Sequence, residues 1–391
     1  MFAIRNWRLK ALVLVLAALL AGGIYSGCNR SSLGEGDSDS ATMGQEAETA
    51  AGPDGALPAV TMPADPFSGL DTLNSTSFYP LAVSIDNASR ARPQTGLSQA
   101  RLVYELPVEG GITRFLAFFP EPQLAEVGPI RSVRPYFLDL AAECGAVLVH
   151  CGGSPEALAR LNAGEVEHID EIANEKLFYR RKDRSAPHNL YGRFDLLLDK
   201  VVERFAPVEP DDVRLPWVIA EEGAAEEAGE AAAEVAGGVA AEVAGAGVAD
   251  HISIKYWSAY TVEYTYAPDN GRYWRTVNGT AHQSDDQPLA ADHVIIQYAD
   301  MDVLDDKGRL SFDASDGGRI VVFTGGTCVE GHWKRTASEG TIFSISSAES
   351  DTGAEVAAGA GVESAATESR LMLSPGIVWV LVVPQGRSVT Y

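Results

Sequence analysis

The chain has 391 residues, and its 54 acidic residues outnumber its 30 lysines and arginines to give a formal net charge of −24. This length suggests two or three domains, and a chain that is 46% hydrophobic has the composition of a globular protein, which excludes a collagen, a coiled coil or a wholly disordered chain. The acidic excess disfavours general binding to nucleic acid or anionic lipid, because phosphate would be repelled. Four cysteines are too few for a disulfide scaffold.

The N-terminus has the pattern of an export signal. Met1–Lys10 carries three basic residues and no acidic residue, and Ala11–Ile24 is almost wholly apolar. The apolar run is shorter than the ~20 residues that a membrane-spanning helix needs. We therefore expect residues 1–27 to be a signal peptide.

Cys28 is the expected site of lipid attachment. It follows Ser26 and Gly27 as in a bacterial lipobox, which this segment resembles, although Tyr25 stands where leucine is usual. Two or three acyl chains hold a protein firmly on a membrane. The expected location is extracytoplasmic, with lipid on Cys28 as the anchor to the cell membrane. The alternative is an uncleaved anchor with an incidental cysteine.

Three stretches of biased composition divide the rest of the chain. Residues 28–77, 220–250 and 348–369 hold 21 of the 54 acidic residues and only one basic residue. We interpret the first as a disordered acidic tether, the second as an Ala/Glu/Gly-rich linker and the third as a low-complexity insert. The two predicted domains are residues 78–219 and residues 251–391, and the second contains the insert. Outside the three biased stretches the folded surface is expected to be only mildly acidic.

The first predicted domain mixes strands and helices. Glu109-Gly110-Gly111 separates two apolar runs, as in a hairpin. Gly145 is a helix stop, and Ser154 followed by Pro155 is a typical helix start. The expected strands are Leu81–Ile85, Leu102–Pro107, Thr113–Phe119 and Ala146–His150, and the expected helices are Pro135–Cys144, one that begins at Pro155, and Tyr191–Phe205. These elements predict an α/β or α+β domain with a mixed sheet.

The second predicted domain is β-rich. Turn-forming sequences lie at Asp269-Asn270-Gly271 and Asp316-Gly317-Gly318. The expected strands are Ile252–Trp257, Thr261–Tyr266, Tyr273–Val277, His293–Tyr298, Arg309–Asp313, Gly318–Thr324, Cys328–Lys334 and Ile377–Val383. Their regular spacing predicts an antiparallel barrel or sandwich, with the third biased stretch as a long surface loop before the last strand.

Several unusual strings occur in a fixed order along the chain. They are Pro80–Asn87 (PLAVSIDN), Ala91–Leu97 (ARPQTGL), Val108–Phe115 (VEGGITRF), Gly128–Tyr136 (GPIRSVRPY), Gly152–Ser154 (GGS), Ala186–Tyr191 (APHNLY), Val294–Tyr298 (VIIQY), Asp306–Arg309 (DKGR) and Gly331–Lys334 (GHWK). Because it contains these strings, the chain resembles the YerB family. The resemblance covers about Pro80–Phe205 and His251–Gln385. The resemblance implies a bacterial lipoprotein with a two-part domain of unknown function, and it implies no established activity.

Arg131 and Arg134 lie three residues apart, just before a predicted helix. Their guanidiniums and the positive end of the helix could together hold a phosphate or a carboxylate. The alternative is that both arginines form structural ion pairs with Asp86, Glu105 or Glu109. Arginine suits bidentate pairing better than lysine, and this domain is rich in arginine. The further ligand-binding candidates among its arginines are Arg92, Arg114 and Arg184.

Gly152, Gly153 and Ser154 form a glycine turn between a strand and a helix. Glycines let a ligand approach the backbone, and N–H groups are free at a helix start, so these residues are ligand-binding candidates. The string is not a P-loop, because it contains no Gly-Lys-Ser/Thr. The alternative is an ordinary strand-to-helix turn. The adjacent His150 and Cys151 point to opposite faces of a strand, so we do not expect them to pair as base and nucleophile.

Three carboxylates and one histidine are candidates for acid–base catalysis. Asp86 stands at a strand end, and with Glu105 or Glu109 it could supply paired carboxylates for glycan hydrolysis. His188 lies in a polar loop and is a candidate proton-transfer group. In the alternative, the acids are salt-bridged to arginines and Asn189 caps the following helix.

Metal and cofactor sites are not predicted, because the seven histidines are scattered without helical or CxxC-type spacing. Cys144 and Cys151 could form a disulfide outside the cell if the helix and strand ends meet. Their pairing stays open at this point.

Three functions remain open from the sequence, and only the second of them would make the protein an enzyme. The first is a non-catalytic lipoprotein whose arginine-rich first domain binds an anionic ligand or partner of the cell envelope. The second is a cell-wall-directed hydrolase or transferase that uses a carboxylate and His188. The third is a structural lipoprotein that docks on another envelope protein through its β-rich domain.

Overall fold

The computed structural model describes residues 65–69, 78–120, 124–209, 212–220, 247–314, 317–346 and 368–391. The predicted signal peptide, Cys28 and most of the tether, linker and insert lie outside these ranges. All described residues belong to one structural unit, Val60–Tyr391. Among them, no helix combines the length and apolar character needed to cross a membrane.

The first part of the chain contains the three described α-helices and the first eight strands. The helices are α2 (Pro135–Glu143), α3 (Pro155–Asn162) and α4 (Phe194–Arg204). The strands are β1 (Leu81–Asp86), β2 (Leu102–Val108), β3 (Ile112–Phe119), β4 (Glu126–Val127), β5 (Val147–His150), β6 (His168–Asp170), β7 (Phe178–Arg180) and β8 (Leu190–Arg193). The 3₁₀ turns are η1 (Ser89–Ala91), η2 (Leu97–Gln99) and η3 (Glu175–Leu177). The hairpin predicted around Gly110 is confirmed as β2–β3.

The second part of the chain is built from strands. The longer ones are β11 (His251–Trp257), β12 (Tyr260–Ala267), β13 (Arg272–Val277), β18 (His293–Ala299), β19 (Gly318–Thr324), β20 (Thr327–Thr336), β21 (Gly340–Ser346) and β24 (Val378–Pro384). The short ones are β9 (Val218–Ile219), β10 (Gly247–Val248), β14 (Thr280–Ala281), β15 (Gln283–Ser284), β16 (Gln287–Pro288), β17 (Ala290–Ala291), β22 (Glu368–Arg370), β23 (Met372–Leu373) and β25 (Ser388–Thr390).

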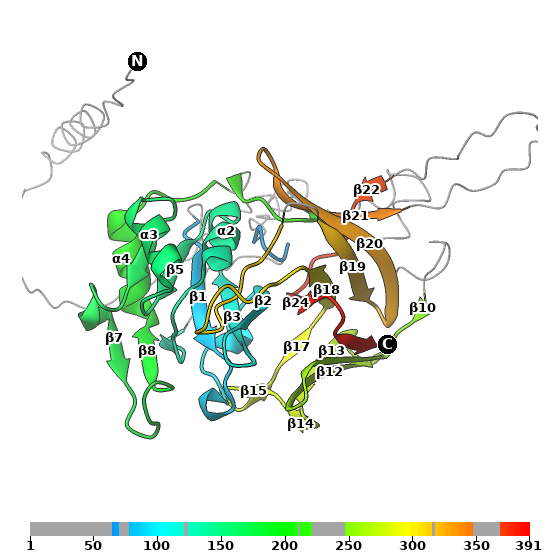
Figure 1. Cartoon of the computed structure of the whole chain (residues 1–391), viewed down its shortest axis with the longest axis horizontal. Helices are drawn as coiled ribbons and strands as arrows, with labels where there is room; N and C mark the ends of the chain where they lie inside the picture. The colour runs from blue at the N-terminus through cyan, green and yellow to red at the C-terminus, as the bar shows by residue number, and fades with distance from the viewer. Residues whose placement is uncertain are drawn as a thin grey trace, which may run out of the picture. The chain divides into compact units, whose positions relative to one another are not determined.

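One twelve-stranded sheet runs through both parts of the chain. Its order is β22-β21-β20-β19-β18-β24-β2-β3-β1-β5-β6, with β10 on β20. Strand β24 joins the two parts, because it is parallel to β18 on one side and to β2 on the other; Val378 pairs with both His293 and Leu102. In Figure 1 the red strand β24 therefore stands beside the cyan strand β2, and the orange strands β20 and β21 belong to the far side of the same sheet.

Side-chain alternation places a core on each face of this sheet. Along β1, Leu81, Val83 and Ile85 pack into the core that also contains β11–β13 and α4, whereas Ala82 packs into the core that contains α2 and α3. The strands β14-β13-β12-β11-β25, with β17 on β13, form a second sheet that is antiparallel throughout. A third sheet has the order β4-β8-β7.

The predicted fold class is confirmed in part. The mixed sheet of the first part is present, since β5 is parallel to β1 while β3 is antiparallel to it, and antiparallel strands dominate the second part. The structure is mostly β, however, and the sheet does not stop at the boundary predicted between the two domains. Strand pairing through β24 makes that sheet continuous.

Two local predictions were wrong. The helix predicted from Tyr191 begins at Phe194, because Leu190–Arg193 pairs with β4 and β7 as a strand; the N-cap is therefore Arg193 and not Asn189. The strand predicted for Arg309–Asp313 makes only isolated bridges to residues 300 and 303. The turn that precedes it is held by the carboxylate of Asp305, which accepts two backbone hydrogen bonds.

The folded unit also begins earlier than the predicted boundary at residue 78. Phe67 falls in the predicted tether but is fully buried, with its ring centroid 5.6 Å from that of Phe78 and 5.5 Å from that of Phe118. Phe67 is the one aromatic residue of the predicted tether, and that is the sequence signal for this contact.

Candidate functional site

The carboxylate of Asp86 is the centre of the candidate site. Strand β1 ends at this residue, which is fully buried. Its Oδ2 lies 2.7 Å from Nδ1 of His188 and 3.2 Å from Nε of Arg131, and its Oδ1 accepts a hydrogen bond from the backbone N–H of Ala88 at 2.9 Å. The fold thus brings together three residues that the sequence singled out separately.

The contact with Asp86 determines which nitrogen of His188 carries the proton. A carboxylate only accepts hydrogen bonds, so Nδ1 of the neutral ring is protonated and Nε2 is left as an acceptor. The His188 side chain is 19% exposed, so a ligand can reach the ring. A buried carboxylate that orients a partly exposed imidazole is a suitable arrangement for a general base.

Three guanidiniums gather around Ser132. Arg114 donates to the backbone oxygen of Ser132 at 2.7 Å and to its Oγ at 3.3 Å, and Arg134 donates to the same Oγ at 3.3 Å. Arg134 also forms a two-pronged ion pair with Glu109, with N–O distances of 2.6 and 2.5 Å. Arg131, next to Ser132 in sequence, completes the set. We call Arg114, Arg131 and Arg134 the arginine cluster.

The arginine cluster has more positive than negative charge. Arg131 is paired with Asp86 and Arg134 with Glu109, but Arg114 has no carboxylate partner among the described residues. Its Nε is buried without a hydrogen-bond partner, and the residue is only 5% exposed. Burial and the charges of Arg134 and Arg131 lower the pKa of Arg114 to about 10, and the charges of Glu109 and Asp86 offset this only in part. An added anion would stabilise this guanidinium.

The two carboxylates that contact the arginine cluster, Asp86 and Glu109, pair with different arginines. Burial opposes ionisation of Glu109, but the hydrogen bonds and charge of Arg134 outweigh it, so the pKa of Glu109 lies below its ordinary value. Glu109 and Asp86 each hold a different arginine, which is the structural alternative to the predicted carboxylate pair.

The predicted glycine turn lies directly beside the arginine cluster. Val133 and Gly153 form a parallel bridge, and the backbone N–H of Ser154 donates to the oxygen of Val133 at 3.1 Å. The N–H of Gly152 donates to Asp170 at 2.9 Å, and the Ser154 hydroxyl caps α3 by accepting from the N–H of Ala157. Two of the backbone donors that suggested ligand contact are thus already used inside the protein.

Glu105 lies in a different, fully buried cluster between the two large sheets. Its carboxylate lies 2.7 Å from Nη2 of Arg275 and accepts hydrogen bonds from the hydroxyls of Tyr260 at 2.5 Å and Thr113 at 2.7 Å. Both charged side chains are 0% exposed. Glu105 therefore has no access to a substrate and serves to join the two parts of the chain. Arg92 borders this cluster, since its guanidinium lies 5.3 Å from the ring centroid of Tyr260.

A chain of hydrogen bonds connects this buried cluster to Asp86. Nε of Arg275 donates to Nδ1 of His282 at 3.0 Å, and because a guanidinium only donates, Nε2 of the neutral imidazole carries the proton. That nitrogen donates to Oε1 of Gln94 at 2.8 Å, and Nε2 of Gln94 donates to the backbone oxygen of Asp86 at 2.9 Å. Burial, followed by the charges of two arginines, lowers the pKa of His282 well below its ordinary value.

Arg275 and His282 were not predicted from the sequence as functional residues. A signal for Arg275 was present: Tyr273, Arg275 and Val277 alternate along β13 and are buried, so a charged residue occupies a core position of the strand. No comparable signal marks His282, which lies between short strands.

Arg184 holds loops together. Its guanidinium donates to the backbone oxygens of Ala91 at 2.5 Å and Pro93 at 2.6 Å. These bonds fasten the loop that carries His188 to the loop that follows Asp86. We therefore interpret Arg184 as a positioning residue for the pair.

The described cysteines are free, so the disulfide considered between Cys144 and Cys151 is not formed. The thiol of Cys151 donates to Oε2 of Glu171 at 3.3 Å. Burial and this hydrogen bond raise the pKa of Cys151 to about 11, which disfavours the nucleophilic thiolate. Within the described ranges, no group of three potential metal ligands occurs.

Comparison with known proteins identifies the class. The description "Protein of unknown function (DUF3048) N-terminal domain" matches residues 67–206, and the corresponding C-terminal domain matches residues 252–361. The first match contains Asp86, the arginine cluster and His188, and the second contains Arg275. The chain therefore belongs to this two-part family.

The YerB resemblance is likewise confirmed. The chain is 30% identical over 274 residues to the Bacillus subtilis (strain 168) protein described as "Putative lipoprotein YerB", covering 69% of this chain and 77% of that protein. It is also similar to the crystal structure of YerB from Bacillus subtilis, with a TM-score of 0.65, 26% identity, and coverage of 84% of this chain and 99% of that one.

Proposed function

We propose that this protein is an extracytoplasmic lipoprotein, anchored by lipid on Cys28, that binds an anionic ligand of the cell envelope at the arginine cluster. Kinship with a protein described as a lipoprotein supports the location, as does the signal-like N-terminus. The observation that carries the binding claim is the buried guanidinium of Arg114, which forms no ion pair of its own among the described residues and lies beside two arginines that each have a carboxylate partner.

The geometry of the arginine cluster favours a phosphate or a carboxylate as the anionic group. The Arg131 side chain is 24% exposed and that of Arg134 is 11% exposed, so a ligand would approach over Arg131. Planar guanidiniums bind these anions through paired hydrogen bonds. Two carboxylates oppose three guanidiniums, so one added negative charge balances the cluster.

Thermal unfolding of the full chain in detergent tests this proposal. The protein is screened against phosphorylated and carboxylated envelope fragments, beside Arg131→Gln and the matched control Arg90→Gln, which removes an exposed arginine of η1. A ligand at 100 times its dissociation constant adds ~2.7 kcal/mol to the stability of the folded state. We expect that gain in the native protein and the control, and its loss in a folded Arg131→Gln variant.

A second function is favoured by the 2.7 Å contact between Asp86 and His188. An anion held on Arg131 would lie near an imidazole whose Nε2 is free to accept a proton, which suits a hydrolase or a transferase. With a ligand from the screen as substrate, His188→Gln would abolish turnover but retain binding. Binding without turnover in the native protein would leave the first function alone.

The anchor has its own test. Labelled palmitate fed to cells is expected to enter the native protein and not a Cys28→Ser variant. Equal labelling of both proteins would place the lipid elsewhere and refute this part of the proposal.

A further inference from the structure

A cavity of about 580 Å³ lies at the end of α2 opposite the arginine cluster. Arg134 precedes the first residue of this helix, whereas Glu143 is its last residue. The volume falls within the range of about 300–1,000 Å³ that is usual for small-molecule sites. The residues that line it come from α2, from the β20–β21 hairpin and from two connecting segments: Asp139, Ala142, Glu143, Arg214, Ala314, Arg335, Thr336, Ala337 and Gly340.

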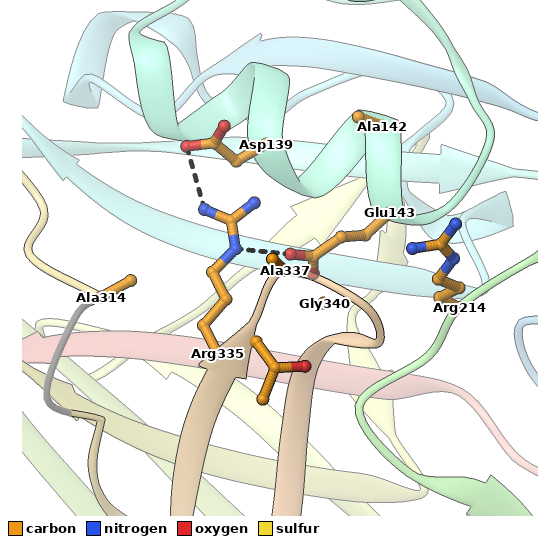
Figure 2. A pocket seen from close by; sticks show the side chains of 9 residues that line it. Asp139, Ala142, Glu143, Arg214, Ala314, Arg335, Ala337 and Gly340 are labelled. Carbon is orange, nitrogen blue, oxygen red and sulfur yellow. Dashed lines mark hydrogen bonds and ion pairs between the residues drawn. The ribbon is translucent and has the colours of Figure 1, made fainter.

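Charges of both signs face this cavity (Figure 2). Arg335 lies between two carboxylates of α2, with Nε 2.7 Å from Oε1 of Glu143 and Nη1 3.3 Å from Oδ2 of Asp139. Asp139 is also paired with Arg160 at 2.6 Å. The alanines of the lining have small side chains and leave room between these groups.

The carboxylate of Glu143 lies in the lining of the cavity and is nearly buried. The residue is 9% exposed, and both of its side-chain hydrogen bonds, from Arg335 and Thr341, fall on Oε1. Burial raises the pKa of Glu143 despite the charge of Arg335 and the hydrogen bonds from Arg335 and Thr341, so an added cation would stabilise the charged carboxylate. The negative end of the α2 dipole lies at the same point, and it too favours a cation.

Arg214 lies on the other side of Glu143 from Arg335 and favours an anion (Figure 2). The residue is exposed, and its guanidinium donates to the backbone oxygen of Ser338 at 3.2 Å. Among the described residues it has no carboxylate partner within ion-pair distance. It is therefore available to a ligand carboxylate.

We propose that this cavity binds a zwitterionic ligand of the short-peptide class, with its ammonium group on Glu143 and Asp139 and its carboxylate on Arg214. A simple anion fits less well, because two carboxylates and a helix C-terminus line the cavity. A simple cation leaves Arg214 without a partner. A short unblocked peptide carries both charges and has backbone groups that can bond to the polar lining.

Calorimetric titration of the full chain in detergent tests this proposal with three matched probes. Trialanine has both charges, N-acetyl-trialanine lacks the ammonium group, and trialanine amide lacks the carboxylate. We expect trialanine to bind and each blocked peptide to bind at least about tenfold more weakly, because each loses a charge-assisted contact.

Two variants assign the contacts. Arg214 is exposed, so Arg214→Gln leaves the Arg335 ion pairs intact. We expect this variant to bind trialanine about tenfold more weakly and to lose the preference for trialanine over trialanine amide. Glu143→Gln is expected to abolish the preference over the N-acetyl form. Arg131→Gln, which removes part of the arginine cluster, should bind trialanine normally, so this test is independent of the proposed anion site.

Three results would overturn the proposal. They are an absence of trialanine binding at millimolar concentration to the folded protein, equal binding of the three peptides, and unchanged trialanine binding by Arg214→Gln. Because Arg214 is exposed, a folding defect in the Glu143→Gln variant would not prevent the test.

Discussion

The ion pair between Glu105 and Arg275 joins the two parts of the chain, and its removal should be costly. Both side chains are 0% exposed, and the Arg275 guanidinium is bonded to Glu105, Tyr264, Tyr260 and His282. In Arg275→Met, the carboxylate of Glu105 stays buried without its cation. Breaking a buried pair in this way costs about 3–5 kcal/mol.

Replacing both partners should cost much less than the sum of the two single changes. In the double variant Glu105→Met/Arg275→Met no buried charge remains, and apolar replacement of a buried pair is often close to neutral. We therefore expect a coupling free energy of at least ~2 kcal/mol between the two positions.

Urea unfolding of the full chain and the three variants in detergent measures this coupling. The single variants should also melt at a lower temperature than the native protein. Single effects that add within ~0.5 kcal/mol would mean that the pair is not coupled, and the reasoning would fail.

Three further predictions concern other residues. Burial lowers the pKa of His282 and His293, so the unfolded chain binds more protons than the folded chain at acid pH. As the pH drops from about 6.5, the free energy of unfolding should decrease by up to ~1.4 kcal/mol per pH unit for each group. Constant stability from about pH 7 to about pH 5.5 in urea titrations would contradict this prediction. Ser154→Ala removes the cap of α3 and should cost about 1 kcal/mol, visible as a lower melting temperature; an unchanged one would argue against the cap. With a pKa of about 11, Cys151 should resist iodoacetamide at pH 7.5 in the folded protein but not in urea, and fast labelling seen by mass spectrometry would refute its inertness.

The elements with strong local signals were predicted well from the sequence. The Gly110–Gly111 hairpin, the Ser154-Pro155 helix start and the strand at Ala146–His150 depend on neighbouring residues, and the structure has all three. The start of α4 was missed because β8 depends on partners from β4 and β7. Local periodicity cannot detect such partners.

The site was predictable as single residues and not as an arrangement. Asp86 and His188 attracted notice for different reasons, and they meet across 102 residues of chain. The join at β24 likewise pairs residues near the C-terminus with β2. Glu105 is a candidate catalytic carboxylate from the sequence alone. Its ion pair with Arg275 is not visible there, because the two residues lie in different parts of the chain.

We propose that the buried charge of Arg114 creates an anion site at the arginine cluster. The most direct measurement is the unfolding free energy of the native protein and of Arg114→Met, each with and without an excess of inorganic phosphate or citrate. We predict that at least one anion stabilises the native protein and not the variant, and that without anion the variant is within ~1 kcal/mol of the native protein, because it loses an uncompensated buried charge. A native protein indifferent to both anions, with an Arg114→Met variant destabilised by about 3–5 kcal/mol, would show that Arg114 is a structural residue and would contradict the account.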